Sequence, residues 1–303
     1  MKIKSCHSTL QKALILLVLG IPVAGFSDEK RSDIKLSFFA NFPTLTTSVS
    51  NNSSSIDYAT NNGVIPNVGV SYGNYGFSFG LGSGSTDKNV HVSTTNRDFQ
   101  GFYYFEKHGV DFYYQEYKGY YIDKTPLQAE DYFPGLRLKT YTLNYYYKLG
   151  GSNALSAMSK EIPSSKSLSS LYYLIASLSD RSLNNSKSII PQNEVANFPE
   201  LKKFQILNAT LAAGVYYPMH WRNWYLNPGI AVGYGIPLKR FSDNLNTSFT
   251  VKVNLKLSMG YAGKTYGFGL IVADDSDAFE GKNNNAIQFQ SLTVSLILIS
   301  YTF

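Results

Sequence analysis

Two long segments of the chain alternate between apolar residues and small or polar residues with a period of two. From Phe249 to Tyr261 one face is entirely apolar or aromatic, whereas the other consists of Thr, Lys, Asn, Ser and Gly. From Trp224 to Ile236 the bulky face is again continuous, and the opposite face consists mainly of Gly, Ala and Asn. Successive side chains of a strand point to opposite faces of the sheet, so this period predicts strands with one apolar face.

Ten further segments show the same alternation with more interruptions. They are residues 34–42, 64–72, 76–82, 93–105, 110–122, 140–147, 172–179, 207–217, 266–272 and 286–303. Bilayer hydrocarbon offers no hydrogen-bond partners, so a sheet that crosses it must close on itself. The sequence therefore predicts an all-β fold, a transmembrane antiparallel β-barrel of about 12 strands. Ten or fourteen strands are the alternatives, because another strand could lie in residues 54–60.

The connections between these strands alternate between short and long. Counted back from the last strand, every second connection is short, at 262–264, 218–223, 106–109 and 73–75, with 148–166 as the exception. The other connections are longer and polar: 43–63, 83–92, 123–136, 180–203, 237–247 and 275–285. Outer-membrane barrels have short periplasmic turns and longer outer loops. The pattern thus predicts the long connections outside the cell and both ends of the barrel in the periplasm.

The beginning of the chain has the features of a secretory signal peptide over residues 1–27. Lys2 and Lys4 precede an apolar run, and small residues at Gly25 and Ser27 offer two cleavage points. The alternative, an N-terminal membrane anchor, conflicts with the shortness of the apolar run. We therefore expect export to the outer membrane and one barrel domain over residues 28–303. The only cysteine, Cys6, would be removed, which excludes disulfides, thiol catalysis and cysteine metal sites from the mature chain.

The last strand ends with an aromatic residue. Ile297, Ile299, Tyr301 and Phe303 would share one face. This ending resembles the closing strand of bacterial outer-membrane barrels, which the barrel-assembly machinery reads. The resemblance implies that this machinery is a partner of the chain.

Composition narrows the classes of protein further. Charged residues make up 16% of the chain, below the ~25% of soluble domains, while 24 Tyr and 19 Phe need burial or an apolar surround. Without its predicted signal peptide the chain has a net charge of +3, which does not indicate nucleic-acid binding. A soluble barrel of the lipocalin type is the alternative. It would expose a continuous apolar face opposite Lys252 and Lys256, and such a face promotes aggregation.

The Tyr-rich segment from Asn96 to Ile122 resembles an uncharacterised bacterial family that is catalogued only as a domain of unknown function. The resemblance covers about residues 34–180. It is carried by Pro66, Asn67, Gly69, Ser71, Tyr72, Asp98, Phe99, Gln100, Tyr103, Tyr104, Tyr113, Tyr114, Gln115, Tyr117, Lys118, Gly119 and Tyr121. It implies an outer-membrane barrel and no particular activity.

Charged residues within the predicted strands are candidates for the lumen. If Tyr113, Tyr117 and Tyr121 face lipid, Glu116 and Lys118 point inward. The opposite choice would cost ~2–4 kcal/mol for a lysine at mid-depth. The luminal candidates are then Asp98, Glu116, Lys118, Lys252 and Lys256. They either pair across the barrel and fill it or line a narrow path.

Three other groups carry candidate chemistry. His91 and Ser93 are spaced to share a face, as in some outer-membrane lipid deacylases and lipases, with Ser93 as nucleophile and His91 as base. Four acidic residues of an expected outer loop could bind Ca²⁺ through oxygen ligands: Asp274, Asp275, Asp277 and Glu280. Arg137 and Lys139 lie at the outer end of their strand, where lipopolysaccharide phosphates would be.

The sequence therefore predicts a non-catalytic outer-membrane barrel without a cofactor. It would be a narrow pore, or a structural or ligand-binding barrel. A lipid-modifying hydrolase that uses His91 and Ser93, and a soluble β-barrel binding protein, are the alternatives. Neither substrate nor oligomeric state can be deduced from the sequence.

Overall fold

The computed structural model describes residues 34–302, apart from residues 86, 88, 125, 152–154, 156–169, 199, 242–246, 264 and 282–285. The predicted signal peptide, its cleavage points and Phe303 lie outside the described residues. Residues 33–303 form one compact unit. Within the described part of the chain, no helix combines the length and the apolar character needed to cross a membrane.

The described residues form fourteen strands and two short 3₁₀ helices. The strands are β1 (Ile34–Ser50), β2 (Ser55–Ala59), β3 (Ile65–Tyr72), β4 (Tyr75–Gly84), β5 (Thr94–Tyr104), β6 (His108–Ile122), β7 (Tyr132–Gly151), β8 (Leu171–Asn184), β9 (Lys203–Tyr216), β10 (Met219–Trp221), β11 (Trp224–Phe241), β12 (Thr247–Ala262), β13 (Tyr266–Gly281) and β14 (Ala286–Thr302). The 3₁₀ helices are η1 (Ala129–Asp131) and η2 (Gln192–Glu194).

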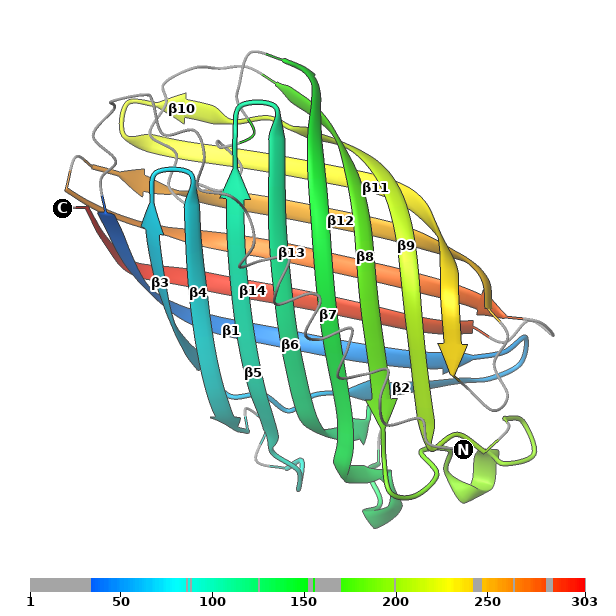
Figure 1. The fold of residues 1–303 in the computed structure, drawn as a ribbon. Helices are drawn as coiled ribbons and strands as arrows, with labels where there is room; N and C mark the ends of the chain where they lie inside the picture. Colours follow the sequence, from blue (N-terminus) through cyan, green and yellow to red (C-terminus); the bar gives the residue numbers. More distant parts are fainter. Residues whose placement is uncertain are drawn as a thin grey trace, which may run out of the picture. The chain divides into compact units, whose positions relative to one another are not determined.

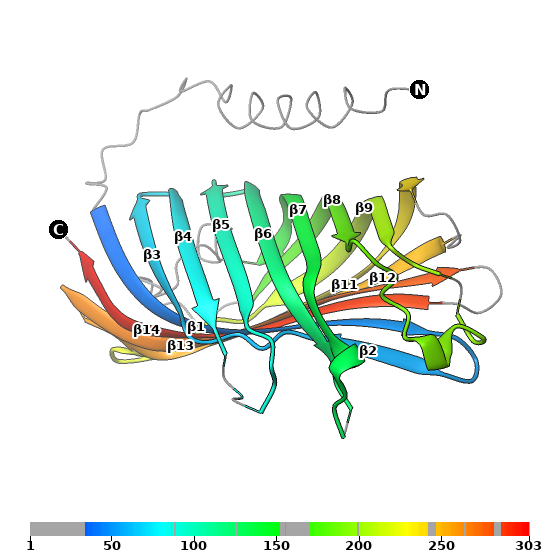
Figure 2. The same ribbon diagram turned by 90° about the horizontal axis from the view of Figure 1, so that it is seen from below.

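Twelve of these strands make a closed antiparallel ring (Figure 1). Neighbours in the ring follow the chain from β3 to β9 and from β11 to β14; β14 pairs with β1, β1 pairs with β3, and the β9–β11 pairing completes the circle. Every pairing in the ring is antiparallel, so the predicted barrel and its count of twelve strands are confirmed. We call the end that carries the β3–β4 and β5–β6 turns the turn end and the opposite end the loop end (Figure 2).

A strand does lie within residues 54–60, but it stands outside the ring. β2 pairs with the loop-end half of β1 and, through Tyr58 and Ala59, with the end of β6. Strands β3, β4 and β5 have only 8, 10 and 11 residues, so they do not accompany β1 and β6 to the loop end. At that end β2 bridges β1 and β6 directly and narrows the barrel.

The outer surface of the barrel changes character along the strands. On β1 the outward side chains of Phe38 and Phe42 are 42% and 46% exposed, and beyond Phe42 the outward positions are Thr44, Thr46 and Ser48. β13 and β14 change in the same way, from apolar residues to Ser276, Gln288 and Gln290. On these strands the exposed apolar belt therefore covers the turn-end half, whereas on β11 and β12 it continues toward the loop end with Ile236, Leu238 and Phe249. Strands of 14–20 residues exceed the ~9–11 that cross a bilayer, so the loop-end half extends past the belt.

The inner surface changes in the opposite sense. Twenty buried apolar residues form one cluster at the loop end, which we call the loop-end core. Its members are Leu45, Val49, Ile56, Tyr58, Tyr117, Tyr120, Ile122, Phe133, Leu136, Leu138, Leu183, Ile189, Ile190, Phe198, Leu201, Phe204, Ile206, Phe279, Ile287 and Phe289. Toward the loop end, the inward positions thus become apolar while the outward ones become polar.

Two bulges change which side chains point inward. Gly119 adopts a positive φ of 97° in β6, and the register with β7 shifts there, so that both Tyr117 and Tyr120 are buried inside. In β14 the register skips Leu298, and Ile297 is therefore buried inside while Ile299 remains exposed. The prediction that Ile297 shares a face with Ile299 and Tyr301 is wrong for this reason.

The loop-end core yields a prediction about stability. Phe289→Ala removes a fully buried ring that contacts Phe204 and Phe279, and we expect it to lower the free energy of unfolding by about 3–5 kcal/mol. Gln288→Ala changes the outward, exposed neighbour on the same strand and should cost less than about 0.5 kcal/mol. Urea unfolding of the refolded barrel measures both values. Equal costs for the two variants would contradict the assignment of faces.

Candidate functional site

A polar layer separates two apolar clusters inside the barrel. The second cluster, which we call the turn-end cluster, consists of Tyr104, Tyr146, Leu155, Leu171, Tyr173, Ile175, Ala212, Tyr216 and Ala231. These residues belong to β5, β7, β8, β9 and β11, and Leu155 belongs to the connection that follows β7. The turn-end cluster therefore covers one side of the lumen, whereas the loop-end core involves seven strands of the ring and β2.

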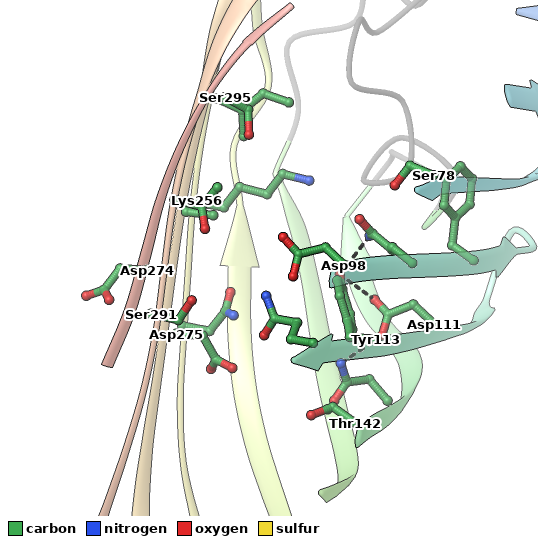
Figure 3. A pocket seen from close by; sticks show the side chains of 18 of the residues that line it. Ser78, Asp98, Asp111, Tyr113, Thr142, Lys256, Asp274, Asp275, Ser291 and Ser295 are labelled. Carbon is green, nitrogen blue, oxygen red and sulfur yellow. Dashed lines mark hydrogen bonds between the residues drawn. The ribbon is translucent and has the colours of Figure 1, made fainter. Parts of the chain in front are cut away.

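The polar layer contains a cavity of about 270 Å³. One wall comes from β3 to β7 and carries Asp98, Asp111 and Tyr113; the facing wall comes from β12 to β14 and carries Lys256 and Asp275 (Figure 3). Other polar residues of the lining are Asn41, Asn67, Ser78, Gln100, Gln115, Thr142, Asn144, Lys252, Asn254, Ser291, Thr293 and Ser295. The inward positions of β12 and β14, which alternate with bulky apolar residues, are thus polar and border this cavity.

Asp111 is the most completely partnered carboxylate in this layer. Its Oδ2 accepts hydrogen bonds from the hydroxyls of Tyr104 at 2.8 Å, Tyr146 at 2.9 Å and Tyr113 at 3.2 Å. Its Oδ1 accepts a bond of 2.7 Å from Asn144 Nδ2. A buried charge needs this many donors to offset the loss of water, so the Asp111 cluster is a structural element that joins β5, β6 and β7.

A chain of ion pairs lies between the cavity and the loop-end core. Asp277 receives a hydrogen bond from the Arg181 guanidinium, and Lys252 Nζ lies 2.9 Å from Asp275 Oδ1 and 3.5 Å from Asp277 Oδ1. Arg181, Lys252 and Asp277 are all at most 5% exposed. In the ring, β9, β11 and β12 separate β8 from β13, so the Arg181–Asp277 pair ties two distant parts of the wall across the lumen.

Three of the five predicted luminal residues line the cavity. Asp98, Lys252 and Lys256 are there, whereas Glu116 and Lys118 lie on the outer face of β6. The prediction for Glu116 and Lys118 is wrong, because it treated their position as mid-depth. Both lie toward the loop end, where the outer surface is already polar, and it is Tyr113, Gln115 and Tyr117 that point inward.

Glu116 is the centre of a charged cluster on the outer surface. Its carboxylate lies 3.3 Å from Arg137 Nε and 3.8 Å from Lys139 Nζ, and it accepts a hydrogen bond of 2.5 Å from the Tyr114 hydroxyl. Arg97 of β5 is the cross-strand partner of Glu116, as Lys139 is on β7. The structure thus places Arg137 and Lys139 on the outer face, as the sequence predicted, and adds Arg97 and Lys118 beside them.

The four acidic residues with predicted calcium chemistry are not in a loop. All four lie within β13, where alternation places Asp275 and Asp277 inside. Asp274 lies on the opposite face of the strand, where Gln290 donates a hydrogen bond of 3.4 Å to it; Glu280 is likewise a strand residue. Among the described residues, no group of three or more acidic, His or Cys side chains is arranged to hold a metal ion. The predicted loop cluster is therefore wrong, because the strand continues through it.

His91 and Ser93 lie in the loop before β5 rather than on a strand. Both are exposed, and the His91 ring packs 5.8 Å from that of Tyr132. Within the described residues no hydrogen bond joins them. The other two histidines of the barrel, His108 and His220, lie at the turn end. His108 Nδ1 is 2.6 Å from the Tyr145 hydroxyl. Partial burial lowers the pKa of the His220 imidazole.

Sequence reasoning missed Arg181 and Asp111. Arg181 falls within the segment 180–203 that was predicted to be a loop, but β8 continues to Asn184. The signal was present, because Ser177, Ser179, Arg181 and Leu183 continue the inward positions of β8 with a period of two. Asp111 was missed because it shares a face with Tyr113, which was expected to face lipid.

The ion-pair chain yields a second prediction. Asp277→Ala leaves the buried Arg181 without its main partner, so we expect a loss of about 3–5 kcal/mol in the free energy of unfolding. The matched control is Lys202→Ala, which breaks an exposed ion pair with Glu200 at 2.7 Å and should cost less than about 1 kcal/mol. Urea unfolding compares the two variants. Similar losses would show that the pair inside the lumen does not hold the wall together.

Comparison with known proteins supplies the family but no activity. A family model described as "Domain of unknown function (DUF4421)" matches residues 26–303. No curated protein matches the chain.

Solved structures of similar proteins are distant in sequence. The translocator domain of the autotransporter NalP from Neisseria meningitidis has a TM-score of 0.41 at 11% identity, covering 97% of this chain and 96% of that one. The transport unit of the Escherichia coli autotransporter AIDA-I has a TM-score of 0.38 at 11% identity, with 98% of each chain covered. The P. putida toluene transporter TodX has a TM-score of 0.34 at 8% identity, with 91% of this chain and 90% of that one covered.

The family match extends well past residues 34–180, which carry the resemblance in sequence, and it includes every strand of the barrel. The chain belongs to the DUF4421 family, whose function is unknown.

Proposed function

We propose that the protein is a non-catalytic barrel of the outer membrane that is closed toward the cell exterior and does not conduct ions. The observation that carries this proposal is the loop-end core, which fills the barrel with apolar side chains on the side of the long connections. An open channel needs a polar, water-filled interior. The proposal therefore favours the structural or ligand-binding barrel over the narrow pore.

The exposed apolar belt supports insertion in a membrane. Large outward residues such as Phe77, Leu211 and Ile236 are more than half exposed, and a soluble protein would rarely leave such a belt uncovered. On most strands the belt lies at the turn end, so the bilayer would surround that half. Short turns face the periplasm in outer-membrane barrels, and the loop end would accordingly project outside the cell.

Two features support closure of the loop end. In the core itself, the Tyr58 hydroxyl of β2 donates a hydrogen bond of 2.7 Å to the carbonyl of Ile189, which joins two connections that are far apart in sequence. Over the short strands β3 to β5, Asn61 fastens the β4–β5 loop: its Nδ2 donates to the carbonyls of Asp87 and Val92, both at 2.9 Å. Its Oδ1 accepts a bond of 3.0 Å from the Asp87 amide. Among the described residues, the two parts together involve ten of the twelve strands of the ring, all but β11 and β12.

The absence of catalysis is part of the proposal, and it is supported by what the polar side chains do. Asp111 is saturated by donors, and Arg181 and Asp277 are paired with each other. Neither group leaves a base or nucleophile poised for reaction. The loop that carries His91 and Ser93 places both outside the cavity.

Planar-bilayer recording tests the proposal. We expect no conductance steps from the purified barrel, because the loop-end core leaves no continuous water path. Stable steps that scale with salt concentration would contradict it.

Silent recordings are informative only if the barrel is inserted and folded, and cysteine labelling in cells provides that control. The barrel has no cysteine of its own, so a single one can be placed at will. Ser53→Cys in the β1–β2 loop should react with a small charged thiosulfonate added to intact cells. Ser291→Cys, which lines the cavity, should react only after the outer membrane is permeabilised. Labelling of Ser291→Cys in intact cells would show a path from outside.

We further propose that the charged cluster around Glu116 contacts lipopolysaccharide. Arg97, Lys118, Arg137 and Lys139 outnumber the single carboxylate. They lie on the loop side of the apolar belt, just beyond the mutually tilted rings of Tyr114 and Tyr141, whose centroids are 4.9 Å apart. Guanidinium and ammonium groups at this level match the phosphates of the outer leaflet.

Replacement of two of these cations tests the contact. Basic residues near an anionic lipid surface contribute about 1 kcal/mol each, so Arg137→Gln with Lys139→Gln should weaken retention roughly 30-fold. The measurement is the amount of lipopolysaccharide that co-purifies with each barrel. The control is Lys107→Gln with Lys148→Gln, an equal change of charge at the turn end, which should leave retention unchanged. Equal retention by both double variants would reject the contact.

A further inference from the structure

One wall of the cavity carries hydrogen-bond acceptors that nothing in the described part of the chain satisfies. Oδ1 of Asn41, Oδ1 of Asn67 and Oδ1 of Asp98 are buried and have no hydrogen-bond partner among the described residues. All three residues line the cavity. The second oxygen of Asp98 receives only a long bond of 3.4 Å from the Tyr117 hydroxyl.

These acceptors are grouped by the register of the sheet. Asn67 of β3 pairs with Gly80 of β4, which in turn pairs with Asp98 of β5. Gly80 has no side chain to separate them, and a Cβ there would lie 2.9 Å from Asn67 Nδ2. Asn41 comes from β1, the next strand of the ring. The three residues thus border one recess of the wall.

Unsatisfied acceptors in such a place indicate a partner from outside the chain. Each buried polar group without a hydrogen bond costs about 1–3 kcal/mol, and native proteins retain few of them. Asn67 is only 8% exposed, so bulk solvent does not relieve this cost. The recess therefore favours a molecule that brings donors to it.

The facing wall offers a different set of groups. Lys256, Ser291, Thr293 and Ser295 of β12 and β14 line the same cavity and supply donors as well as hydroxyl acceptors (Figure 3). Asp274 also belongs to the lining, but its side chain points away from the cavity (Figure 3). The carboxylates of Asp98, Asp111 and Asp275 then face the ammonium groups of Lys252 and Lys256, which leaves an excess of one negative charge. An anion would meet the unsatisfied Asp98, and a cation would meet two ammonium groups. Together these groups favour a neutral ligand.

We propose that this cavity binds a small neutral ligand rich in hydroxyl groups, such as a single sugar ring. Hydroxyls donate to the acceptors of Asn41, Asn67 and Asp98 and accept from Lys256 and the serines opposite. The rings of Phe102 and Tyr113 in the lining provide faces for the carbon side of such a molecule. The volume of about 270 Å³ lies just below the ~300–1,000 Å³ of most ligand pockets, which limits the ligand to this size.

This inference rests on the proposed closed barrel, because closure of the loop end leaves the turn end as the way in. On that side the turn-end cluster covers the strands from β5 to β11. On β1, β3 and β14 the inward positions alternate between small residues (Ser37, Gly69 and Ser295) and the larger Phe39 and Ile297, so this side is less completely covered. The ligand would thus be taken from the periplasmic side.

Saturation-transfer NMR on the full-length barrel, refolded in a detergent without a sugar headgroup, tests the inference. The probes are D-glucose as the neutral polyol, glutamate as the anion and putrescine as the cation. We expect saturation of glucose alone. Asp98→Asn turns an acceptor into a donor and Asn67→Leu removes one, so each should weaken glucose binding at least tenfold. The matched control Asp123→Asn, on an exposed residue outside the cavity, should bind glucose like the unaltered protein.

Several results would overturn the inference. These are no saturation of glucose, a stronger signal from glutamate or putrescine, and glucose binding that Asp98→Asn and Asn67→Leu leave unchanged. If both variants fail to fold, Ala273→Phe on the facing wall replaces them, since a ring there enters the cavity from a position whose cross-strand partners are Lys256 and Thr293 rather than the acceptors. Absence of binding together with absence of conductance would reject the ligand and leave the closed barrel standing.

Discussion

The structure depends on one constraint: every backbone amide and carbonyl in a hydrocarbon layer needs a partner within the protein. Closure of the ring through β9 and β11 meets it, since each of the twelve strands then has two antiparallel neighbours. Once the ring is closed, the alternation of side chains is fixed and only the chemistry of the two faces can vary. It does vary, because the apolar face is outside at the turn end and inside at the loop end. The same backbone geometry thus serves a membrane in one half and a globular core in the other.

Three strands bear on the closure that we propose for the loop end. β3, β4 and β5 stop short of the loop end, which would leave a gap in a uniform cylinder. β2 and the loop held by Asn61 occupy this sector. Ile56 and Tyr58 of β2 belong to the loop-end core, and Val90 and Val92 of the loop are buried. The loop-end core is therefore made from strands and connections together. A barrel whose interior is packed in this way resembles a soluble β-protein over that half, and its stability there follows the rules of buried cores.

The sequence predicted the ring much better than the site. Period-two alternation located all twelve strands, because each has at least one continuous face within the belt. The prediction of faces failed at some positions, because the alternation does not show how deep in the membrane a residue lies or where a bulge occurs. Glu116 and Lys118 are outward because they lie beyond the belt, and Ile297 is inward because a bulge shifts β14 by one residue. Arg181, Asp275 and Asp277 lie on strand ends that continue where the polar composition predicted loops. Depth and bulges depend on neighbouring strands, which a single sequence does not reveal.

Asp98 and Asp111, the two carboxylates on the β5–β6 side of the lumen, differ in how far the protein itself satisfies them. Asp111 and Asp98 lie on neighbouring strands and line the same cavity, yet among the described residues Asp111 accepts four hydrogen bonds and Asp98 accepts one long one. A fold that only needed to fill its interior would gain by treating both alike, because each missing bond costs stability. Retaining Asp98 beside the equally unsatisfied Asn41 and Asn67 is reasonable if their partner comes and goes. The unequal treatment of two similar side chains is thus the strongest sign that this cavity has a ligand.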